Sequence, residues 1–224
     1  MREDVLKKYF NDEVDFKRLK YDDDFEYKES PQLFEVLNSI KNKTVLSLGC
    51  GTGRELKFLI KNKNKVVGID IAEKVIEKSK KIEPKAEYHC MDLVKYQDKR
   101  KYDYILALNS VMDYIIKKEN RIKVANNCID MLKKDGRIIL ELNLLNLKDK
   151  FKLIVAPIIA LILGEYKYYN FGDIYYRKFN DKGEKIYFVK THLYTLKELR
   201  KLFKNMNFEF IKERDMIYLI KINN

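Results

Sequence analysis

The stretch that decides the fold is Val45-Leu46-Ser47-Leu48-Gly49-Cys50-Gly51-Thr52-Gly53, an aliphatic run that ends in three glycines at two-residue spacing. A segment with apolar residues three and four positions apart follows over Glu55–Lys63, which predicts a helix. A strand that enters a helix through such a turn is typical of a parallel α/β sheet. Because glycine lacks a Cβ atom, the turn lets a ligand approach bare backbone, and the free N–H groups at the helix start favour an anionic or polar group.

The same strand–helix pattern repeats further along the chain, which predicts a parallel sheet with helices on both faces. The predicted strands are Thr44–Leu48, Lys65–Asp70, Ala86–Cys90, Tyr102–Leu108 and Arg137–Leu142. The predicted helices between them are Glu55–Lys63, Ala72–Lys81 and Lys118–Lys133, the last ended by a turn at Asp135-Gly136.

The remaining residues are assigned around this core as parts of one domain. We expect an N-terminal helical segment over 1–43, the core over 44–143, an inserted lid over 144–194, and a closing helix (Thr195–Met206) with two strands over 195–224. The predicted fold is α/β, a Rossmann-like three-layer sandwich. Its mostly parallel seven-stranded sheet has an antiparallel last strand, and Ile174–Phe179 and Lys185–His192 form the lid hairpin.

Composition indicates a globular chain with a basic surface. The 46 Lys and Arg residues exceed the 34 Asp and Glu residues, for a formal charge of +12. A solvated surface and an anionic partner such as RNA both explain this excess. Three separated cysteines without a CxxC pair argue against a disulfide framework and a structural zinc site, so no metal is predicted and the cytoplasm is the expected compartment.

Neither a signal peptide nor a transmembrane segment is predicted. The first residues include acidic side chains and no apolar run. The longest apolar run, Leu153–Leu163, is shorter than the roughly 20 residues that span a bilayer and contains Pro157. We interpret it as a buried or lid helix.

Two carboxylates extend the glycine turn into a nucleoside site. Arg54 stands where a nicotinamide-binding loop needs its third glycine, so a dinucleotide is disfavoured. Asp70 ends the second predicted strand, where it can accept hydrogen bonds from ribose hydroxyls. Asp92, after the third strand, lies between apolar residues and suits an exocyclic amine.

Taken together, Val45–Gly53, the strand-terminal Asp70 and the Met91-Asp92 turn resemble the class I S-adenosylmethionine-dependent methyltransferases. Tyr102–Ile105 and Leu132–Arg137 stand where that family carries its fourth strand and the turn before its fifth. The resemblance covers residues 44–143 and implies an enzyme that uses S-adenosyl-L-methionine.

By this resemblance, Gly49 and Gly51 lie near the methionine moiety, Asp70 binds the ribose and Asp92 binds the adenine amine. Ile71 and Leu93 contact the ring, and Asn109 faces cofactor or substrate. The complete predicted cofactor set is Gly49, Cys50, Gly51, Arg54, Asp70, Ile71, Met91, Asp92, Leu93 and Asn109. For Arg54 a surface ion pair is the alternative, and Cys50 is expected to be a small buried side chain rather than a nucleophile.

The acceptor is expected to contact the lid, and a small molecule is the leading prediction. The predicted substrate residues are Tyr114, Asp173, Arg177 and Tyr194. His192 is the candidate general base, because its pKa lies near neutrality, and a hydrogen-bonded structural histidine is the alternative.

Two other functions stay open at this stage. Gly172-Asp173 followed by His192-x-Tyr194 resembles wobble-uridine tRNA methyltransferases, whose distinctive tryptophans are missing here. The chain is alternatively a non-catalytic cofactor-binding or membrane-surface module that uses Phe151–Leu163 as an anchor beside Lys148, Lys150 and Lys152.

Overall fold

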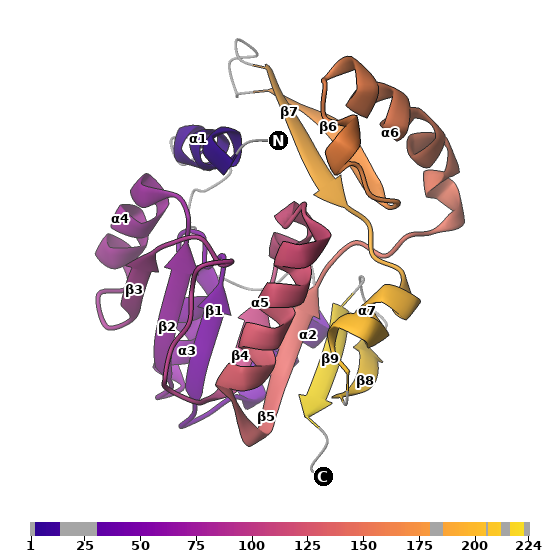
Figure 1. Ribbon diagram of the computed structural model, residues 1–224. Coiled ribbons are helices and arrows are strands. Elements are labelled where there is room, and N and C mark those ends of the chain that lie inside the picture. Colours follow the sequence, from indigo (N-terminus) through magenta and orange to yellow (C-terminus); the bar gives the residue numbers. More distant parts are fainter. Residues whose placement is uncertain (1–2, 14–30, 180–185, 205, 212–215, 222–224) are drawn as a thin grey trace.

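The computed structural model describes residues 3–13, 31–179, 186–204, 206–211 and 216–221 (Figure 1). Within these residues a seven-stranded sheet has the order β3-β2-β1-β4-β5-β9-β8. Its strands are β1 Thr44–Leu48, β2 Lys65–Asp70, β3 Glu87–Cys90, β4 Tyr102–Ala107, β5 Leu132–Glu141, β8 Met206–Ile211 and β9 Met216–Lys221.

The strands that follow the glycine turn run parallel to one another. β1 pairs with β2 on one side and with β4 on the other, and β4 pairs with β5, all in parallel. β9 is antiparallel to both β5 and β8. The carboxyl ends of β1, β2, β3, β4 and β5 therefore meet at one edge of the sheet, and the predicted Rossmann-like α/β class with a mostly parallel sheet is confirmed.

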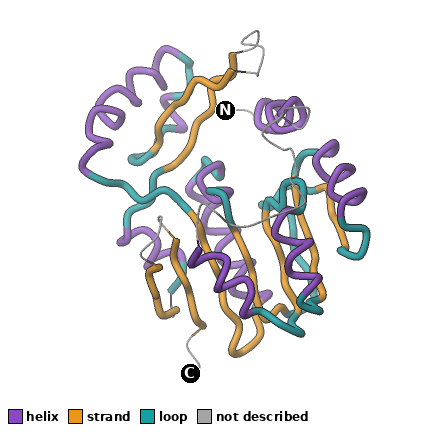
Figure 2. The backbone as a smooth tube through the Cα atoms, turned by 180° about the vertical axis from the view of Figure 1, so that it is seen from behind, coloured by secondary structure: helices purple, strands orange, loops and turns teal. Residues whose placement is uncertain are grey.

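Helices cover both faces of the sheet (Figure 2). The helices of this core are α2 Pro31–Ser39, α3 Arg54–Lys61, α4 Glu73–Ile82, α5 Lys118–Met131 and α7 Leu196–Leu202. One buried cluster joins Leu37 of α2 and Leu56 of α3 to the sheet, and a second joins Cys128 of α5 and Leu199 of α7 to its other face. Burial of these apolar side chains, at about 25 cal/mol per Å², holds the three layers together.

Some element bounds differ from those predicted. α5 ends at Met131, and β5 starts at Leu132 rather than Arg137. Tyr102 pairs with Leu132 and Tyr104 with Arg137, so residues 133–136 form an irregularity inside β5. The predicted turn at these residues is therefore a bulge within a strand. The predicted helix Thr195–Met206 is shorter in the structure. Its counterpart α7 ends at Leu202, and Met206 is the first residue of β8.

The N-terminal helix α1 (Glu3–Glu13) packs partly against the start of α4, where Phe10 shares a small cluster with Ala72 and Val75. Tyr9 is buried in a cluster with Val189, and the Phe10 ring lies edge-on to Tyr114 at a centroid distance of 5.4 Å. α1 thus contacts the lid strand that contains Val189, and this contact between distant segments could not be read from local periodicity.

The residues between β5 and α7 form a separate group of elements beside the carboxyl edge of the sheet (Figure 1). They comprise α6 (Lys150–Ile162) and an antiparallel pair of strands, β6 (Asp173–Phe179) and β7 (Ile186–His192). Ala156 of α6 packs on Ile174 of β6 and on Leu193. We call α6, β6, β7 and the residues between them the lid. The side chains of Arg177 and Lys178 lie outside the described part of the chain.

A buried chain of ion pairs attaches the lid to the core. Asp173 and Lys190, on paired lid strands, lie 2.8 Å apart between Oδ2 and Nζ. His192 Nδ1 lies 2.8 Å from Asp173 Oδ1, and its Nε2 lies 2.9 Å from Glu198 Oε2 on α7. Arg121 Nε of α5 donates to Glu198 Oε1 at 3.2 Å. The chain of contacts runs from the lid to two helices of the core.

The contacts of His192 favour a charged ring. Burial lowers the pKa of His192, but the hydrogen bonds to Asp173 and Glu198 outweigh burial and raise it. Burial likewise raises the pKa values of both carboxyls, and the bonds to His192 and the neighbouring cations lower them below the usual values. An imidazolium between two carboxylates has both nitrogens occupied as donors. These contacts favour the structural alternative for His192, and its candidate role as a general base stays a prediction.

We predict that His192→Ala lowers the free energy of unfolding by about 3 kcal/mol at pH 6, because it leaves the buried Asp173 and the half-buried Glu198 without their shared partner. A raised folded pKa means that the contribution is complete below the unfolded pKa of about 6.5 and is lost as the pH rises through the folded value. Denaturant unfolding of wild type and variant across this pH range measures the difference.

The matched control is His89→Ala, since His89 is half-exposed and pairs with Glu87 at 2.6 Å. Its loss should cost about 1 kcal/mol or less, as for other surface pairs. Equal effects of the two substitutions, or an effect of His192→Ala that grows toward alkaline pH, would contradict the assignment.

Candidate functional site

The glycine turn after β1 has a left-handed backbone at each glycine, with φ of 61° at Gly49, 54° at Gly51 and 80° at Gly53. The glycines serve different purposes. A Cβ atom on Gly49 would lie 2.1 Å from Cγ2 of Val111, so this glycine permits close packing. A Cβ atom on Gly51 would meet nothing within 4 Å. The backbone of Gly51 is therefore the part of the turn that a ligand can approach.

Asp70, at the end of β2, is tied to this turn. Its Oδ2 accepts a hydrogen bond from the backbone N–H of Gly51 at 3.0 Å, and its Oδ1 accepts one from Ala72 at 2.9 Å. Burial raises the pKa of Asp70, and the backbone N–H groups partly offset this effect. Each carboxylate oxygen retains a further lone pair, so the side chain can also accept hydrogen bonds from a ligand.

The turn after β3 lies next to Asp70. The backbone N–H of Met91 donates to the carbonyl oxygen of Asp70 at 2.9 Å. Asp92 Oδ1 accepts the N–H of Val94 at 2.9 Å, which fixes the orientation of this carboxylate. Asp92 and Leu93 are half-buried and Met91 is exposed. A polar acceptor flanked by apolar groups is the environment that the sequence predicts for a base ring.

The backbone is strained at the end of β4. Asn109 and Ser110 have φ values of 53° and 59°, which non-glycine residues adopt at a cost of about 1–2 kcal/mol each. Their N–H groups donate to Glu141 at the end of β5, Asn109 to Oε2 at 2.8 Å and Ser110 to the carbonyl oxygen at 3.0 Å. Glu141 thus holds a strained turn at the same edge as the glycine turn.

Two buried acids near this edge were missed by the sequence analysis. Asp113 is fully buried and accepts hydrogen bonds from Asn143, the shortest from Nδ2 at 2.6 Å. Burial raises the pKa of Asp113 to about 7 against the opposing effect of Asn143. Glu55 of α3 is buried and accepts the Ser47 hydroxyl at 3.1 Å. The signal for Asp113 was a lone acid within the apolar stretch directly after a predicted strand.

The predicted cofactor residues lie at or beside one edge of the sheet, whereas the predicted substrate residues are dispersed. Cys50 is buried within the glycine turn, and burial raises the pKa of its thiol, as expected for a small core side chain. Arg54 begins α3 and is half-buried, and Ile71 is half-buried after β2. Cys50 and Arg54 come after the end of β1, and Ile71 comes after the end of β2, so all three lie near the same edge of the sheet.

Among the predicted substrate residues, Tyr194 and Asp173 are fully buried. The Tyr194 hydroxyl donates to the carbonyl oxygen of Met112 at 2.8 Å, and Asp173 belongs to the ion pairs of the lid. Tyr114 is half-buried against Phe10. The backbone of Arg177 lies in β6. Asp173 and Tyr194 therefore connect lid and core, and in this structure they present no open surface to an acceptor.

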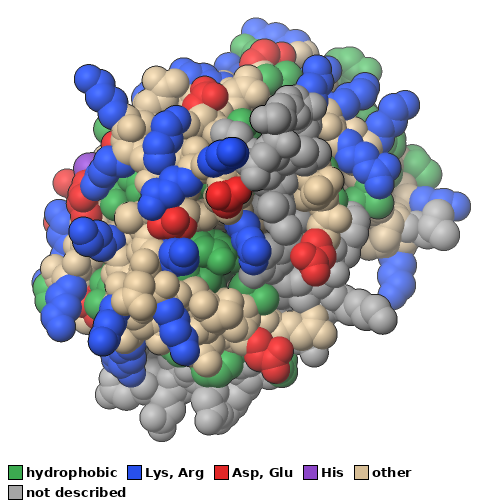
Figure 3. Space-filling view, turned by 90° about the horizontal axis from the view of Figure 1, so that it is seen from below, with side chains coloured by type: hydrophobic (Ala, Val, Ile, Leu, Met, Phe, Trp, Pro, Cys, Tyr) green, Lys and Arg blue, Asp and Glu red, His purple; other side chains and the backbone are tan. Residues whose placement is uncertain are grey.

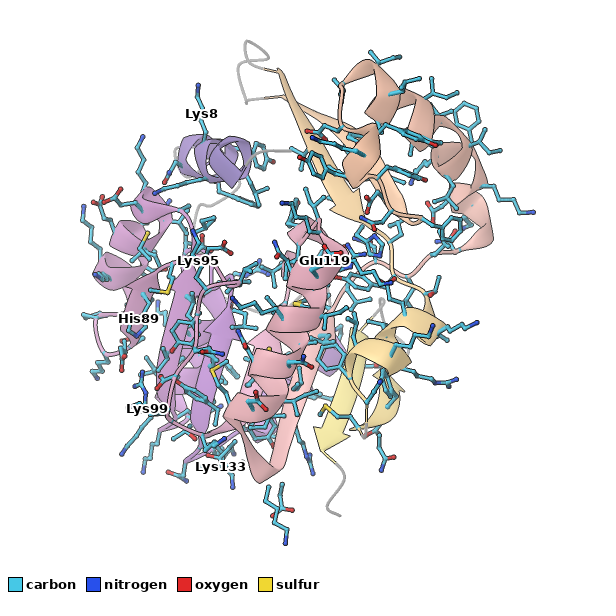
Figure 4. All side chains as sticks on the ribbon, viewed as in Figure 1. Lys8, His89, Lys95, Lys99, Glu119 and Lys133 are labelled. Atoms are coloured by element: carbon cyan, nitrogen blue, oxygen red, sulfur yellow. The ribbon has the colours of Figure 1, made fainter. Side chains whose placement is uncertain are left out.

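The charged side chains of the core that Figure 4 labels lie at both of its ends. Figure 4 places Lys95 and Glu119 at the end of the core that faces the lid, and Lys99 and Lys133 at the opposite end. On the face seen in Figure 3, Lys and Arg side chains are spread widely with Asp and Glu between them. No group of three or more metal-ligating side chains occurs in the described part of the chain.

The comparisons with known proteins agree with this geometry. Residues 45–136 match the family described as "Methyltransferase domain". A ubiquinone biosynthesis O-methyltransferase from Pelagibacter ubique is 29% identical over 183 residues, which cover 77% of this chain and 68% of that protein. Three other curated relatives are matched over 32%, 21% and 42% of their length, so the chain spans less than half of each.

Solved structures show the same fold at low sequence identity. An S-adenosylmethionine-dependent methyltransferase from Clostridium acetobutylicum superposes with a TM-score of 0.63 at 18% identity, covering 98% of this chain and 99% of that one. A DhpI–SAH complex gives 0.67 at 13% identity, covering 97% and 94%. Residues 45–136 thus match a methyltransferase domain, and the chain shares its overall fold with both of these solved structures.

Proposed function

We propose that this chain transfers the methyl group of S-adenosylmethionine to a small organic acceptor, with residues 144–194 acting as the substrate lid of a single domain. The observation that carries the proposal is the open approach to Gly51 beside the anchored carboxylate of Asp70. That arrangement suits a ligand with a polar chain and a ribose, and the methyltransferase domain match supports the same cofactor.

We assign the residues at the sheet edge to the cofactor in the order that the sequence predicts. Asp70 accepts the ribose hydroxyls through its remaining lone pairs, while Gly49 and Gly51 lie along the methionine moiety. Asp92 accepts the exocyclic amine of adenine, and Ile71 and Leu93 contact the ring. When bound, the cofactor would supply a sulfonium methyl group, whose carbon the acceptor attacks in line while the thioether of S-adenosylhomocysteine leaves. The protein's task is to align the two reactants and to exclude water.

The turn after β4 sets the boundary between cofactor and acceptor. Asn109 and Ser110 are held in their strained conformations by Glu141, and Ser110 Oγ accepts a hydrogen bond from Asn143 Nδ2 at 3.1 Å. Asp113 binds Asn143 from the buried side. We assign Asp113 and Asn143 to positioning this turn. Asp173, His192 and Tyr194 position the lid in the same way.

A small acceptor is favoured over tRNA. A tRNA site requires the basic residues of the lid and of the last helix to converge on one face. Among the described basic residues of the last helix, Arg200, Lys201 and Lys204 are exposed on α7 and at its end. The Pelagibacter relative is named an O-methyltransferase, which supports an oxygen nucleophile as the acceptor atom.

We predict that Asp70→Ala weakens binding of S-adenosylmethionine at least about tenfold, because it removes a charged hydrogen-bond acceptor and releases the N–H of Gly51. Isothermal titration calorimetry of the purified chain measures the dissociation constant. Glu77→Ala, at an exposed acid on α4, is the matched control and should leave binding unchanged. Equal affinity in wild type and Asp70→Ala would contradict the assignment of Asp70, and no binding by folded wild type would contradict the proposed function.

Substitution of two glycines in the same turn should have different consequences. Gly49→Ala places a methyl group against Val111 and should lower the free energy of unfolding by about 1–3 kcal/mol. Gly51→Ala meets no protein atom, although its backbone strain costs about 1 kcal/mol, and it should weaken cofactor binding by more than its effect on stability. Thermal unfolding with and without cofactor separates the two effects. If the cofactor raised the unfolding temperature of Gly51→Ala as much as that of wild type, the proposed position of the cofactor beside Gly51 would be contradicted.

The acceptor class is tested with cofactor that carries a labelled methyl group. We expect label to enter hydroxyl-bearing small molecules in an acceptor screen, and bulk tRNA in the parallel reaction to remain unlabelled. Asp70→Ala is the negative control, because its reduced cofactor binding should lower incorporation at limiting cofactor. Label found in tRNA alone would replace the small-molecule proposal with the RNA alternative.

A further inference from the structure

The lid helix α6 turns its large apolar side chains outward. Its buried positions are two alanines, Ala156 and Ala160. Five larger residues are exposed by more than half of their surface, namely Phe151, Ile154, Ile158, Leu161 and Ile162. They recur three or four positions apart or side by side, so they form one stripe along the helix. A helix that packs only against its own domain has the opposite arrangement, with its large apolar residues inside.

Neighbouring residues enlarge this stripe. Leu163 follows α6 directly, and Tyr166, Tyr168 and Phe171 are exposed on the segment that leads to β6. We call these residues, with the five exposed ones of α6, the apolar lid face. Soluble monomers expose single apolar residues frequently, but contiguous apolar patches of this kind mark an interaction surface. Ile158 at 56% and Ile162 at 77% exposure are typical members.

The charge around the apolar lid face is positive. Lys148, Lys150, Lys152 and Lys167 are exposed on α6 and its flanks. Among the described acids here, Asp173 is fully buried between Lys190 and His192, and Glu165 is half-buried. Asp149, which precedes α6, is buried beside Lys152 with 2.9 Å between Oδ1 and Nζ. Exposed lysines that flank an apolar stripe complement a surface with an apolar interior and an anionic rim.

The place of α6 in the fold leaves this surface accessible. Figures 1 and 2 show α6 at the outer side of the lid, with the β6–β7 strands between it and α1. Some side chains of α6 project away from the lid strands in Figure 4, whereas Ala156 packs against β6. Within the described residues, no helix is long and apolar enough to cross a bilayer. A 13-residue helix of this kind, roughly 20 Å long, suits a position parallel to a membrane surface.

We propose that the apolar lid face docks on an anionic phospholipid bilayer, with α6 lying in the interface between headgroups and acyl chains. The exposed isoleucine, leucine and phenylalanine side chains enter the apolar boundary. Lys148, Lys150 and Lys167 contact the anionic headgroups. The contact would orient the lid toward the membrane and does not depend on the methyl-transfer reaction.

Vesicle flotation with the full chain tests the proposal. The probe is a phosphatidylcholine vesicle with about a quarter phosphatidylglycerol, compared with pure phosphatidylcholine. We expect wild type to float with the anionic vesicles and less with neutral ones. The double variant Ile158→Glu/Leu161→Glu should reduce the bound fraction at least about tenfold, because two apolar contacts are replaced by charges that anionic lipid repels.

The matched control is Ile122→Glu, which makes the same change at an exposed apolar residue of α5. It should float as wild type does, and circular dichroism should show native helix content in all three proteins. Lys148→Glu/Lys150→Glu should weaken binding to anionic vesicles and leave binding to neutral vesicles unchanged. Weaker binding of Lys148→Glu/Lys150→Glu to anionic vesicles, together with unchanged binding to neutral vesicles, would support the proposed orientation.

Three results would overturn the proposal. The first is wild type that does not float, and the second is equal flotation of wild type and Ile158→Glu/Leu161→Glu. The third is a wild-type dimer that this double variant converts to a monomer without any vesicle binding, which would make the apolar lid face an interface between two copies. Size-exclusion chromatography with light scattering distinguishes the third result from the first.

Discussion

The hydrogen bond from the N–H of Gly51 to Asp70 Oδ2 joins the ends of two neighbouring parallel strands. Leu48 at the end of β1 is level with Ile69 of β2, so the residues that follow each strand necessarily leave the sheet side by side. Cys50 N–H donates to the carbonyl oxygen of Ile69 at 2.9 Å and brings the turn back onto β2. The register of the sheet therefore places bare backbone and a carboxylate together, and the other features of the site are arranged around that pair.

The lid depends on a different kind of interaction, because its attachment consists of buried charges. Lys190, His192 and Arg121 are almost completely buried, each with a carboxylate or carbonyl partner. Burying ions costs several kcal/mol each, and the pairing recovers this cost only in a well-defined geometry. The network consequently favours one orientation of β6 and β7 over α7, which an apolar contact of the same size would define less sharply.

The core could be predicted from sequence because its signals are local. Strand-like runs, glycines and strand-terminal acids follow one another between Thr44 and Glu141, and the parallel sheet brings the ends of these runs to one edge. The roles that depend on distant contacts could not be predicted. A histidine has a neutral-range pKa in isolation, and the contacts of His192 come from Glu198, which lies on a helix of the core, and from Asp173 on the paired strand. The hydrogen bond that the buried Asp113 accepts likewise comes from Asn143, 30 residues away.

The lid reverses the usual distribution of side chains. A periodic apolar segment such as Phe151–Leu163 predicts a helix, but periodicity does not reveal which side will be covered. Here the alanines Ala156 and Ala160 permit a close approach to β6, while Ile154, Leu161 and neighbouring residues remain in contact with water. Charges buried inside and large apolar residues exposed outside are both unfavourable for an isolated chain in water. The inner charges are compensated by one another, whereas the outer apolar residues are compensated only when another apolar phase covers them. This asymmetry is the physical basis for assigning the outer face of the lid to a membrane surface rather than to the interior of the domain.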